Sequence, residues 1–211
     1  TLSMRLYNAD GSIAEMSGNG IRCLVQAAHS TLGNNAGTTY EVITDAGVRE
    51  VTVVSHHSDG QILARVDMGE VSDLDAPKNW NELQCDPLRP VRHVSLGNPH
   101  SVVGVDDVVS VDLESLGALV PHINLEIIQP GPEDNAVTMR VHERGAGITQ
   151  ACGTGACAAA DAAIAWGFVP STSSEVIVHM DGGDALVHIT KNRHAVLTGL
   201  AVFMSEHSVT A

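Results

Sequence analysis

The chain has 211 residues, of which 44% are hydrophobic and only 3% aromatic, and its formal charge is -14. This composition is typical of a globular protein with an aliphatic core. The excess of acidic residues argues against nucleic acid or an anionic membrane surface as a partner. No apolar run reaches the length of a membrane-spanning helix. Four cysteines are too few for a disulfide scaffold, so we expect reduced thiols and a cytoplasmic location.

The first part of the chain predicts short strands around one helix. Residues 3–7 are expected to form a strand that runs into a turn at 8–11. A glycine loop over 15–20 leads into a helix over 21–32, which Gly33 ends. Alternating apolar positions predict a hairpin of strands 39–44 and 49–55. The polar stretch 56–60 is the predicted boundary between two domains.

The remainder predicts mainly strands, a loop over 71–90, a weak helix over 108–120 and a helix over 153–166. The predicted strands are 61–68, 91–96, 101–105, 124–129, 136–143, 175–180, 185–190, 195–200 and a weak final strand over 202–209. Two antiparallel-rich sheets, each with one prominent helix, define an α+β fold. We assign residues 1–59 with 200–211 to an N-terminal domain and residues 60–199 to a C-terminal domain.

A cysteine stands directly before a glycine-rich turn in Cys152-Gly-Thr-Gly155, and an alanine run follows it. Alanine favours helix, so Cys152 is expected at a helix N-terminus. Free backbone N–H groups and the helix dipole stabilise a thiolate there and lower its pKa. The glycines allow an anionic group to approach the backbone. The alternative is a buried structural cysteine.

A second stretch, Ser17-Gly-Asn-Gly20, has the same layout. A shift of 135 positions lays Ser17 on Cys152, and it also superposes the glycines and two alanines that follow. Self-similarity of this kind indicates two related structural units. Two such helix starts facing one another hold one anionic group and place one reactive side chain on each side of it. This geometry fits removal of a proton from one face of a carbon and its return to the other.

Other constellations are weaker. The eleven histidines show neither a His-Glu-x-x-His pattern nor paired Cys-x-x-Cys motifs, so no metal site is expected. The glycine turns lack the Lys-Ser/Thr of a nucleotide-binding loop. Glu143 and Arg144 lead into the cysteine loop, where arginine suits a carboxylate and glutamate an ammonium group; the alternative is a surface ion pair. Three asparagines follow strand-like segments and suit either a zwitterion or a turn: Asn8, Asn98 and Asn124.

The sequence contains five motifs: Asn8-Ala-Asp-Gly-Ser12, Glu15-Met-Ser-Gly-Asn-Gly-Ile-Arg-Cys23, Leu96-Gly-Asn-Pro-His100, His142-Glu-Arg-Gly-Ala-Gly147 and Thr149-Gln-Ala-Cys-Gly-Thr-Gly-Ala-Cys157. Together they resemble the motifs of the diaminopimelate epimerase family and occur in the same order. The resemblance implies a cofactor-independent conversion of LL- to meso-diaminopimelate in lysine and peptidoglycan precursor synthesis. It also implies two pseudo-symmetric domains, each wrapped around a central helix, with the site between them. Family members commonly form dimers, so a homodimer is expected.

The resemblance also implies the roles of individual residues. Cys152 matches one of two catalytic cysteines, and Ser17 stands where the other belongs. The positions that match the substrate-binding set are Asn8, Gly18, Asn19, Asn98, Asn124, Glu143, Arg144, Gly153 and Thr154.

Two features depart from the family. The first is Ser17, which stands in place of a catalytic cysteine. Serine is a far weaker acid than cysteine, so Ser17 needs a neighbouring base such as His100 to take its proton. Cys23 lies within the predicted helix and is expected to be a core cysteine. Compared with the family, the sequence also begins roughly 60 residues late, without its opening Gly-Asn-Asp-Phe motif. Two alternatives therefore stand beside the epimerase: an impaired or non-catalytic ligand-binding member, and a proline-racemase-like enzyme acting on another amino acid.

Overall fold

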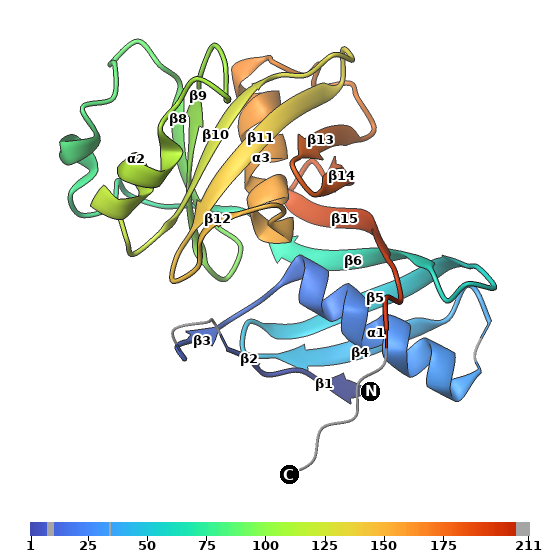
Figure 1. The fold of residues 1–211 in the computed structure, drawn as a ribbon. Coiled ribbons are helices and arrows are strands. Elements are labelled where there is room, and N and C mark those ends of the chain that lie inside the picture. Colours follow the sequence, from blue (N-terminus) through green and yellow to red (C-terminus); the bar gives the residue numbers. More distant parts are fainter. Residues whose placement is uncertain (8–10, 34, 206–211) are drawn as a thin grey trace.

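A computed structural model describes residues 1–7, 11–33 and 35–205. Twelve strands form one continuous hydrogen-bonded path, and a thirteenth joins it at the side (Figure 1). The path runs in the order β1 (Leu2–Ser3), β4 (Thr39–Thr44), β5 (Gly47–His56), β6 (Ile62–Glu70), β15 (His194–Ala201), β14 (Gly183–Ile189), β13 (Val176–Met180), β11 (Ala136–Glu143), β10 (Asn124–Pro130), β9 (Pro99–Gly104), β8 (Val91–Ser95) and β7 (Ser72–Asp73).

The pairs β1–β4, β9–β10 and β11–β13 are parallel, and the other pairs along this path are antiparallel. The side strand β12 (Gly147–Thr149) pairs with β11. A separate two-stranded sheet joins β2 (Leu6–Tyr7) to β3 (Ile13–Ala14). The predicted α+β fold class with its antiparallel-rich sheet is therefore confirmed.

Helix α3 (Gly153–Trp166) is the central element of the larger lobe (Figure 1). Its alanines leave no polar face, and most of the helix is buried. A helix that is apolar all round is stable only inside a core. It packs against β8, β9, β10, β11, β13, β14 and β15, so the curved sheet wraps around it.

Helix α1 (Gly18–Leu32) packs one face against β5, β6 and β15. Ile21 and Val25 are fully buried on that face, whereas Cys23 is exposed on the other. The predicted core position of Cys23 is therefore wrong, because in the described part of the chain the sheet covers one side of α1. Both helices end at a left-handed glycine, Gly33 and Gly167.

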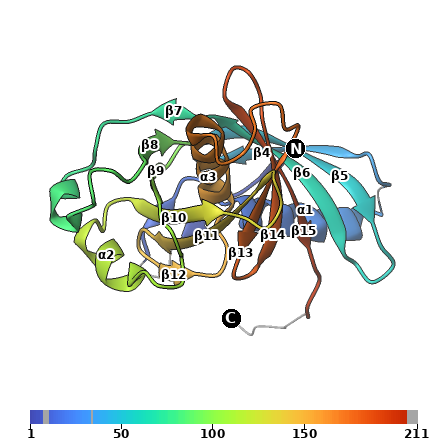
Figure 2. The ribbon, with the colours of Figure 1, turned by 90° about the horizontal axis from the view of Figure 1, so that it is seen from above.

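The third helix, α2 (Leu113–Leu119), is shorter than the predicted helix over 108–120. Asp112 caps it by accepting from the Ser115 N–H at 3.2 Å, which sets its start. The Val108 N–H instead donates to the Gln129 side chain at 2.7 Å, and Val108 lies in a second apolar cluster. Figure 2 shows α2 at one end of the molecule and the β5–β6 hairpin at the other.

Several smaller elements differ from prediction. The strand expected over 3–7 is split between β1 and β2, because the chain leaves β4 after Met4 and pairs next with β3. Residues 202–205 form no strand, so the final strand is absent over that stretch, and 206–209 lie outside the described residues. The predicted turn over 8–11 falls largely outside them too. The short elements β7, β12 and η1 (Trp80–Leu83) were not predicted.

The predicted domain boundary at residues 56–60 lies at the turn between β5 and β6. Strand β6 then pairs with β5 on one side and with β15 on the other, so the hydrogen-bond ladder continues across it. The assignment of residues 1–59 with 200–211 and of residues 60–199 to two domains stays a prediction.

A buried carboxylate anchors the far part of α3. Asp161 is 5% exposed, and its oxygens accept from Arg92 at 2.7 Å and from Arg193 at 2.9 and 3.0 Å. Both arginines also contact Asp73 on β7. This network ties α3 to the surrounding sheet. No helix among the described residues is long and apolar enough to cross a membrane.

Candidate functional site

The two helix starts are built alike. Ser17 caps α1 with φ -141° and ψ 118°, and Cys152 caps α3 with φ -132° and ψ 115°. The Ser17 hydroxyl oxygen accepts from the Gly20 N–H at 3.0 Å, and the Cys152 sulfur accepts from the Gly155 N–H at 3.4 Å. The internal repeat in the sequence therefore corresponds to a repeated local structure, in which an oxygen and a sulfur occupy equivalent positions.

Gly18 and Gly153 touch where the helices meet. A Cβ added to Gly153 would lie 2.8 Å from the Gly18 Cα, and one added to Gly18 would lie 3.0 Å from the Gly153 Cα. Real Cβ atoms essentially never come as close as the contact at Gly153, and the contact at Gly18 is tighter than nearly all real ones. Both positions need glycine for the close approach of two backbones. The sequence indicated anion binding at these glycines but not this contact, which brings the positive ends of two helices together.

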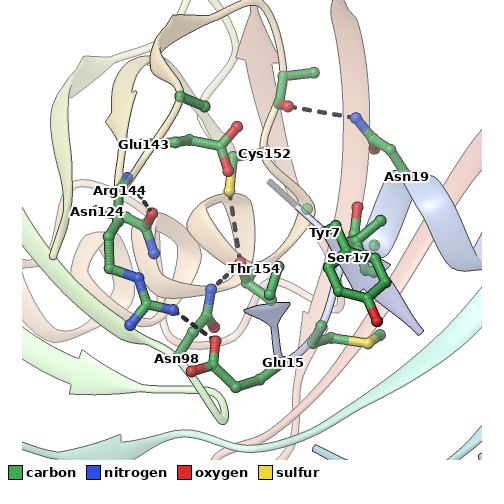
Figure 3. A pocket seen from close by; sticks show the side chains of 17 residues that line it. Tyr7, Glu15, Ser17, Asn19, Asn98, Asn124, Glu143, Arg144, Cys152 and Thr154 are labelled. Atoms are coloured by element: carbon green, nitrogen blue, oxygen red, sulfur yellow. Dashed lines mark hydrogen bonds and ion pairs between the residues drawn. The ribbon is translucent and has the colours of Figure 1, made fainter. Parts of the chain in front are cut away.

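The two helix starts line one pocket of about 220 Å³. Its lining contains every described residue of the predicted site: Ser17, Gly18, Asn19, Asn98, Asn124, Glu143, Arg144, Cys152, Gly153 and Thr154. Asn8 lies outside the described residues. Figure 3 shows these side chains converging from α1, α3 and the ends of the strands.

Two further polar residues line the pocket, Tyr7 and Glu15. The Arg144 guanidinium donates to the Glu15 carboxylate at 2.6 Å (Figure 3). Among the ion pairs of the described residues, this one alone joins a residue before 60 to a residue after it. Glu15 stands in the motif that begins the glycine loop, but the sequence does not indicate that it pairs with Arg144.

The asparagines also fix the loops around the pocket. The Asn19 amide donates to the Ala151 carbonyl at 3.3 Å, and so joins the start of α1 to the loop before Cys152. Asn124 donates to the Pro99 carbonyl at 3.0 Å and accepts from the Arg144 N–H at 2.9 Å. Asn98 donates to the Thr154 hydroxyl at 3.2 Å. These side chains position Arg144 and Thr154 as well as facing the cavity.

The Cys152 thiol is 5% exposed, and its pKa is raised well above the ordinary value. Burial is the largest cause, followed by the neighbouring carboxyl groups of Glu143 and Glu126, whereas the hydrogen bond with Thr154 lowers it. The expectation of a lowered pKa at this helix start is therefore wrong. Desolvation and nearby acidic groups raise the thiol pKa despite its place at the start of α3.

His100 is buried behind the pocket. Its Nδ1 bonds to Glu126 at 2.6 Å and its Nε2 to the Asn98 side-chain oxygen at 3.1 Å. Both ring nitrogens are thus occupied, and His100 is not among the residues that line the cavity. The hypothesis that His100 takes a proton directly from Ser17 is not supported by this arrangement.

The fold is similar to that of a solved structure described as a predicted epimerase. The solved structure of a predicted epimerase from Pseudomonas aeruginosa superposes with a TM-score of 0.74 at 14% identity, over 99% of this chain and 79% of the other. At such identity the likeness concerns the fold alone.

The sequence decides the family. The profile of diaminopimelate epimerase matches residues 1–74 and 92–204. The diaminopimelate epimerase of Halothermothrix orenii is 39% identical over 86% of this chain and 68% of its own length. That of Agathobacter rectalis is 37% identical over 96% and 79%. The chain therefore belongs to the diaminopimelate epimerase family.

Proposed function

We propose that this chain epimerises LL-diaminopimelate to meso-diaminopimelate, without a cofactor, by proton transfer at Cα between two side chains. The observation that carries the proposal is the pair of matched helix starts, which present Ser17 and Cys152 to one pocket. An acid and a base on opposite faces of one carbon are what inversion requires. Family membership supplies the substrate.

The α-carboxylate of the substrate lies between the two helix starts in this proposal. Gly18 and Asn19 offer N–H groups from α1, and Gly153 and Thr154 offer them from α3. Removal of the Cα proton moves negative charge onto this carboxylate. Fixed N–H groups and two helix dipoles stabilise that charge most strongly as it develops, which lowers the barrier.

The α-ammonium group and the second carboxylate of the substrate would be held by charged and amide side chains. Arg144 suits the second carboxylate and Glu143 suits an ammonium group, with Asn98 and Asn124 beside them and Asn8 proposed from the sequence. Arg144 already pairs with Glu15. The second carboxylate of the substrate therefore either binds Arg144 together with Glu15 or displaces Glu15 from it. Arg144→Lys should raise the KM more than it lowers kcat, because lysine cannot bind a carboxylate in a bidentate manner.

Substrate binding also changes the protonation of Cys152. The charge of Glu143 is the second cause of the raised thiol pKa. An ammonium group bound beside Glu143 offsets this charge and brings the pKa back towards neutrality. Closure of the pocket around the substrate keeps water from the reacting groups.

Ser17 favours a second candidate function, one-sided chemistry in an impaired or ligand-binding member. A helix terminus shifts a pKa by too little to make serine a ready base, and loss of one positioned acid or base costs about 10² to 10⁴ in rate. Cys152 would then exchange the Cα proton of one stereoisomer while inversion is slow.

Incubation with LL- and meso-diaminopimelate in deuterated water separates these functions. Deuterium uptake with inversion supports the epimerase, uptake without inversion supports one-base chemistry, and binding without uptake supports a binding protein. Ser17→Cys should raise inversion strongly if the serine is the limiting group, and Cys152→Ser is the matched control that abolishes uptake. Proline tested in parallel addresses the proline-racemase-like alternative.

Two broader expectations belong to the same proposal. A cytoplasmic location agrees with the four cysteines, which are all free thiols. A homodimer is expected from the family, and light scattering of the purified chain measures it. The proposed partners are small amino acids, with no role for nucleic acid or a membrane.

A further inference from the structure

A buried chain of hydrogen bonds leads from β10 to the reactive thiol. Glu126 and His100 have fully buried side chains, and Glu126 Oε1 lies 2.6 Å from His100 Nδ1. His100 Nε2 lies 3.1 Å from Asn98 Oδ1, and Asn98 Nδ2 lies 3.2 Å from the Thr154 hydroxyl oxygen. That oxygen is 3.5 Å from Cys152 Sγ.

The chemistry of each group gives this chain a direction. An amide oxygen can only accept, so His100 Nε2 carries the hydrogen that it donates to Asn98. The Asn98 amide nitrogen in turn donates to the Thr154 oxygen. The hydroxyl hydrogen of Thr154 is then free to point at the sulfur. A hydrogen donated to the sulfur favours the thiolate over the thiol.

Glu126 supplies the first link. With a hydrogen on Nε2, His100 Nδ1 either accepts from a protonated Glu126 or shares its own proton with a carboxylate, so one proton lies between the two atoms. The second oxygen of Glu126 is buried without a partner. An unpaired oxygen costs less in a neutral acid than in a buried carboxylate, and burial raises the pKa of Glu126.

Glycine at position 155 makes room for this carboxyl group. A Cβ added to Gly155 would lie 2.8 Å from Glu126 Oε1. The side chain thus reaches the first turn of α3, where Cys152 caps the helix.

We propose that Glu126 is a positioning residue that donates its proton to His100 Nδ1 and thereby sets the hydrogen-bond chain so that Thr154 donates to Cys152. The inference rests on the proposed function in one respect, because it gives Cys152 the role of the base. Glu126 itself does not line the pocket.

The competing role for Glu126 is that of a buried negative charge. Among the described residues, the acidic groups that act on the Cys152 thiol are Glu143 from β11 and Glu126 from β10. The titratable groups that act on Glu126 are His100 from β9 and Glu143 from β11. As a charge, Glu126 would raise the thiol pKa, whereas as a donor it lowers the pKa through Thr154. The two roles predict opposite shifts.

The test compares Glu126→Gln, which keeps an N–H donor, with Glu126→Met, which has neither donor nor charge. Cys152 alkylation by iodoacetamide is followed by peptide mapping across the pH range, without substrate. We expect Glu126→Met to move the alkylation midpoint up by about one pH unit, the scale of a lost hydrogen bond to a charged group. Glu126→Gln should leave the midpoint near that of the unaltered protein. In turnover, Glu126→Met should lower kcat and spare KM.

Asp161→Asn is the matched control, since it removes a buried carboxylate of α3 itself that takes no part in the chain of bonds, and it should leave the midpoint unchanged. A lower midpoint in both Glu126 variants would overturn the proposal in favour of the charge. Alkylation midpoints equal to that of the unaltered protein in both variants would also overturn the proposal, because Glu126 would then act only by packing. If Glu126→Met does not fold, Thr154→Val must raise the midpoint, and an unchanged value overturns the proposal. Because alkylation needs no substrate, failure to turn over diaminopimelate does not affect this test.

Discussion

Replacing Gly153 with alanine tests the contact between the two helix starts. Two effects compete. Alanine is favoured over glycine within a helix by about 1 kcal/mol. Against this, the new Cβ would lie 2.8 Å from the Gly18 Cα, 3.3 Å from the Gly18 nitrogen and 3.3 Å from the Leu197 side chain. Backbone atoms cannot move aside as a flexible side chain does, and overpacking costs about 1–3 kcal/mol. We therefore expect a net loss of about 0–2 kcal/mol in unfolding free energy.

The effect on catalysis should be larger than the effect on stability. Cys152 directly precedes Gly153 and Ser17 directly precedes Gly18, so separating the helices moves both reactive groups and widens the gap between them. A misplacement of about 1 Å can cost about 10² in rate. Urea denaturation measures the stability, and deuterium uptake at Cα measures the chemistry.

Gly33→Ala is the control for this experiment. Gly33 has φ +65°, and nothing lies within 4 Å of an added Cβ. Alanine there carries a conformational cost of about 1 kcal/mol at the opposite end of α1, so stability should fall while activity per folded molecule is kept. If Gly153→Ala instead stabilises the protein as helix propensity alone predicts, with uptake unchanged, the close contact of the helices is not a requirement of the site.

Three further predictions concern reactivity and stability. Iodoacetamide should label the exposed Cys23 before the buried Cys152 at neutral pH, with Cys152 following as the pH rises; peptide mapping that finds Cys152 labelled first would contradict the raised thiol pKa. The hydrogen bond that His179 donates to Glu133 is the largest cause of its raised pKa, so the stability that His179 contributes is present below its ordinary pKa of about 6.5 and is lost as the pH rises through its folded-state pKa. His179→Gln should therefore lower the unfolding free energy measured with urea more at mildly acidic pH than at alkaline pH. The difference should be below about 1 kcal/mol because the pair is partly exposed. An equal loss at both pH values would refute the linkage. Asp161→Asn should reduce the unfolding free energy by about 3 kcal/mol, since it leaves two arginines facing an uncharged group, and an unchanged thermal midpoint would show that the network contributes nothing.

The sequence by itself determined the two helices and most of the strands, and it predicted the residues that the structure brings around one pocket. Strong local signals carry that information. An alanine run with no breaker before Gly167 sets α3, and the repeated Ser/Cys-Gly-x-Gly pattern marks both helix starts. The same motifs give the family, which explains why residues far apart in the chain were assigned to one pocket.

Tertiary structure alone decided the relations between these parts. The clash that forbids a side chain at Gly18 or Gly153 arises between helices 135 residues apart, so no local pattern carries it. The thiol pKa is raised by burial and by acidic groups on β10 and β11, and neither the extent of burial nor these neighbours can be derived from the residues around Cys152 in the sequence. Glu15 and Glu126 stand in ordinary strand and loop contexts, and their partners Arg144 and His100 meet them only through strand pairing and the approach of the two halves. Electrostatic energy depends on distance and on the surrounding medium, and both are set by the folded structure.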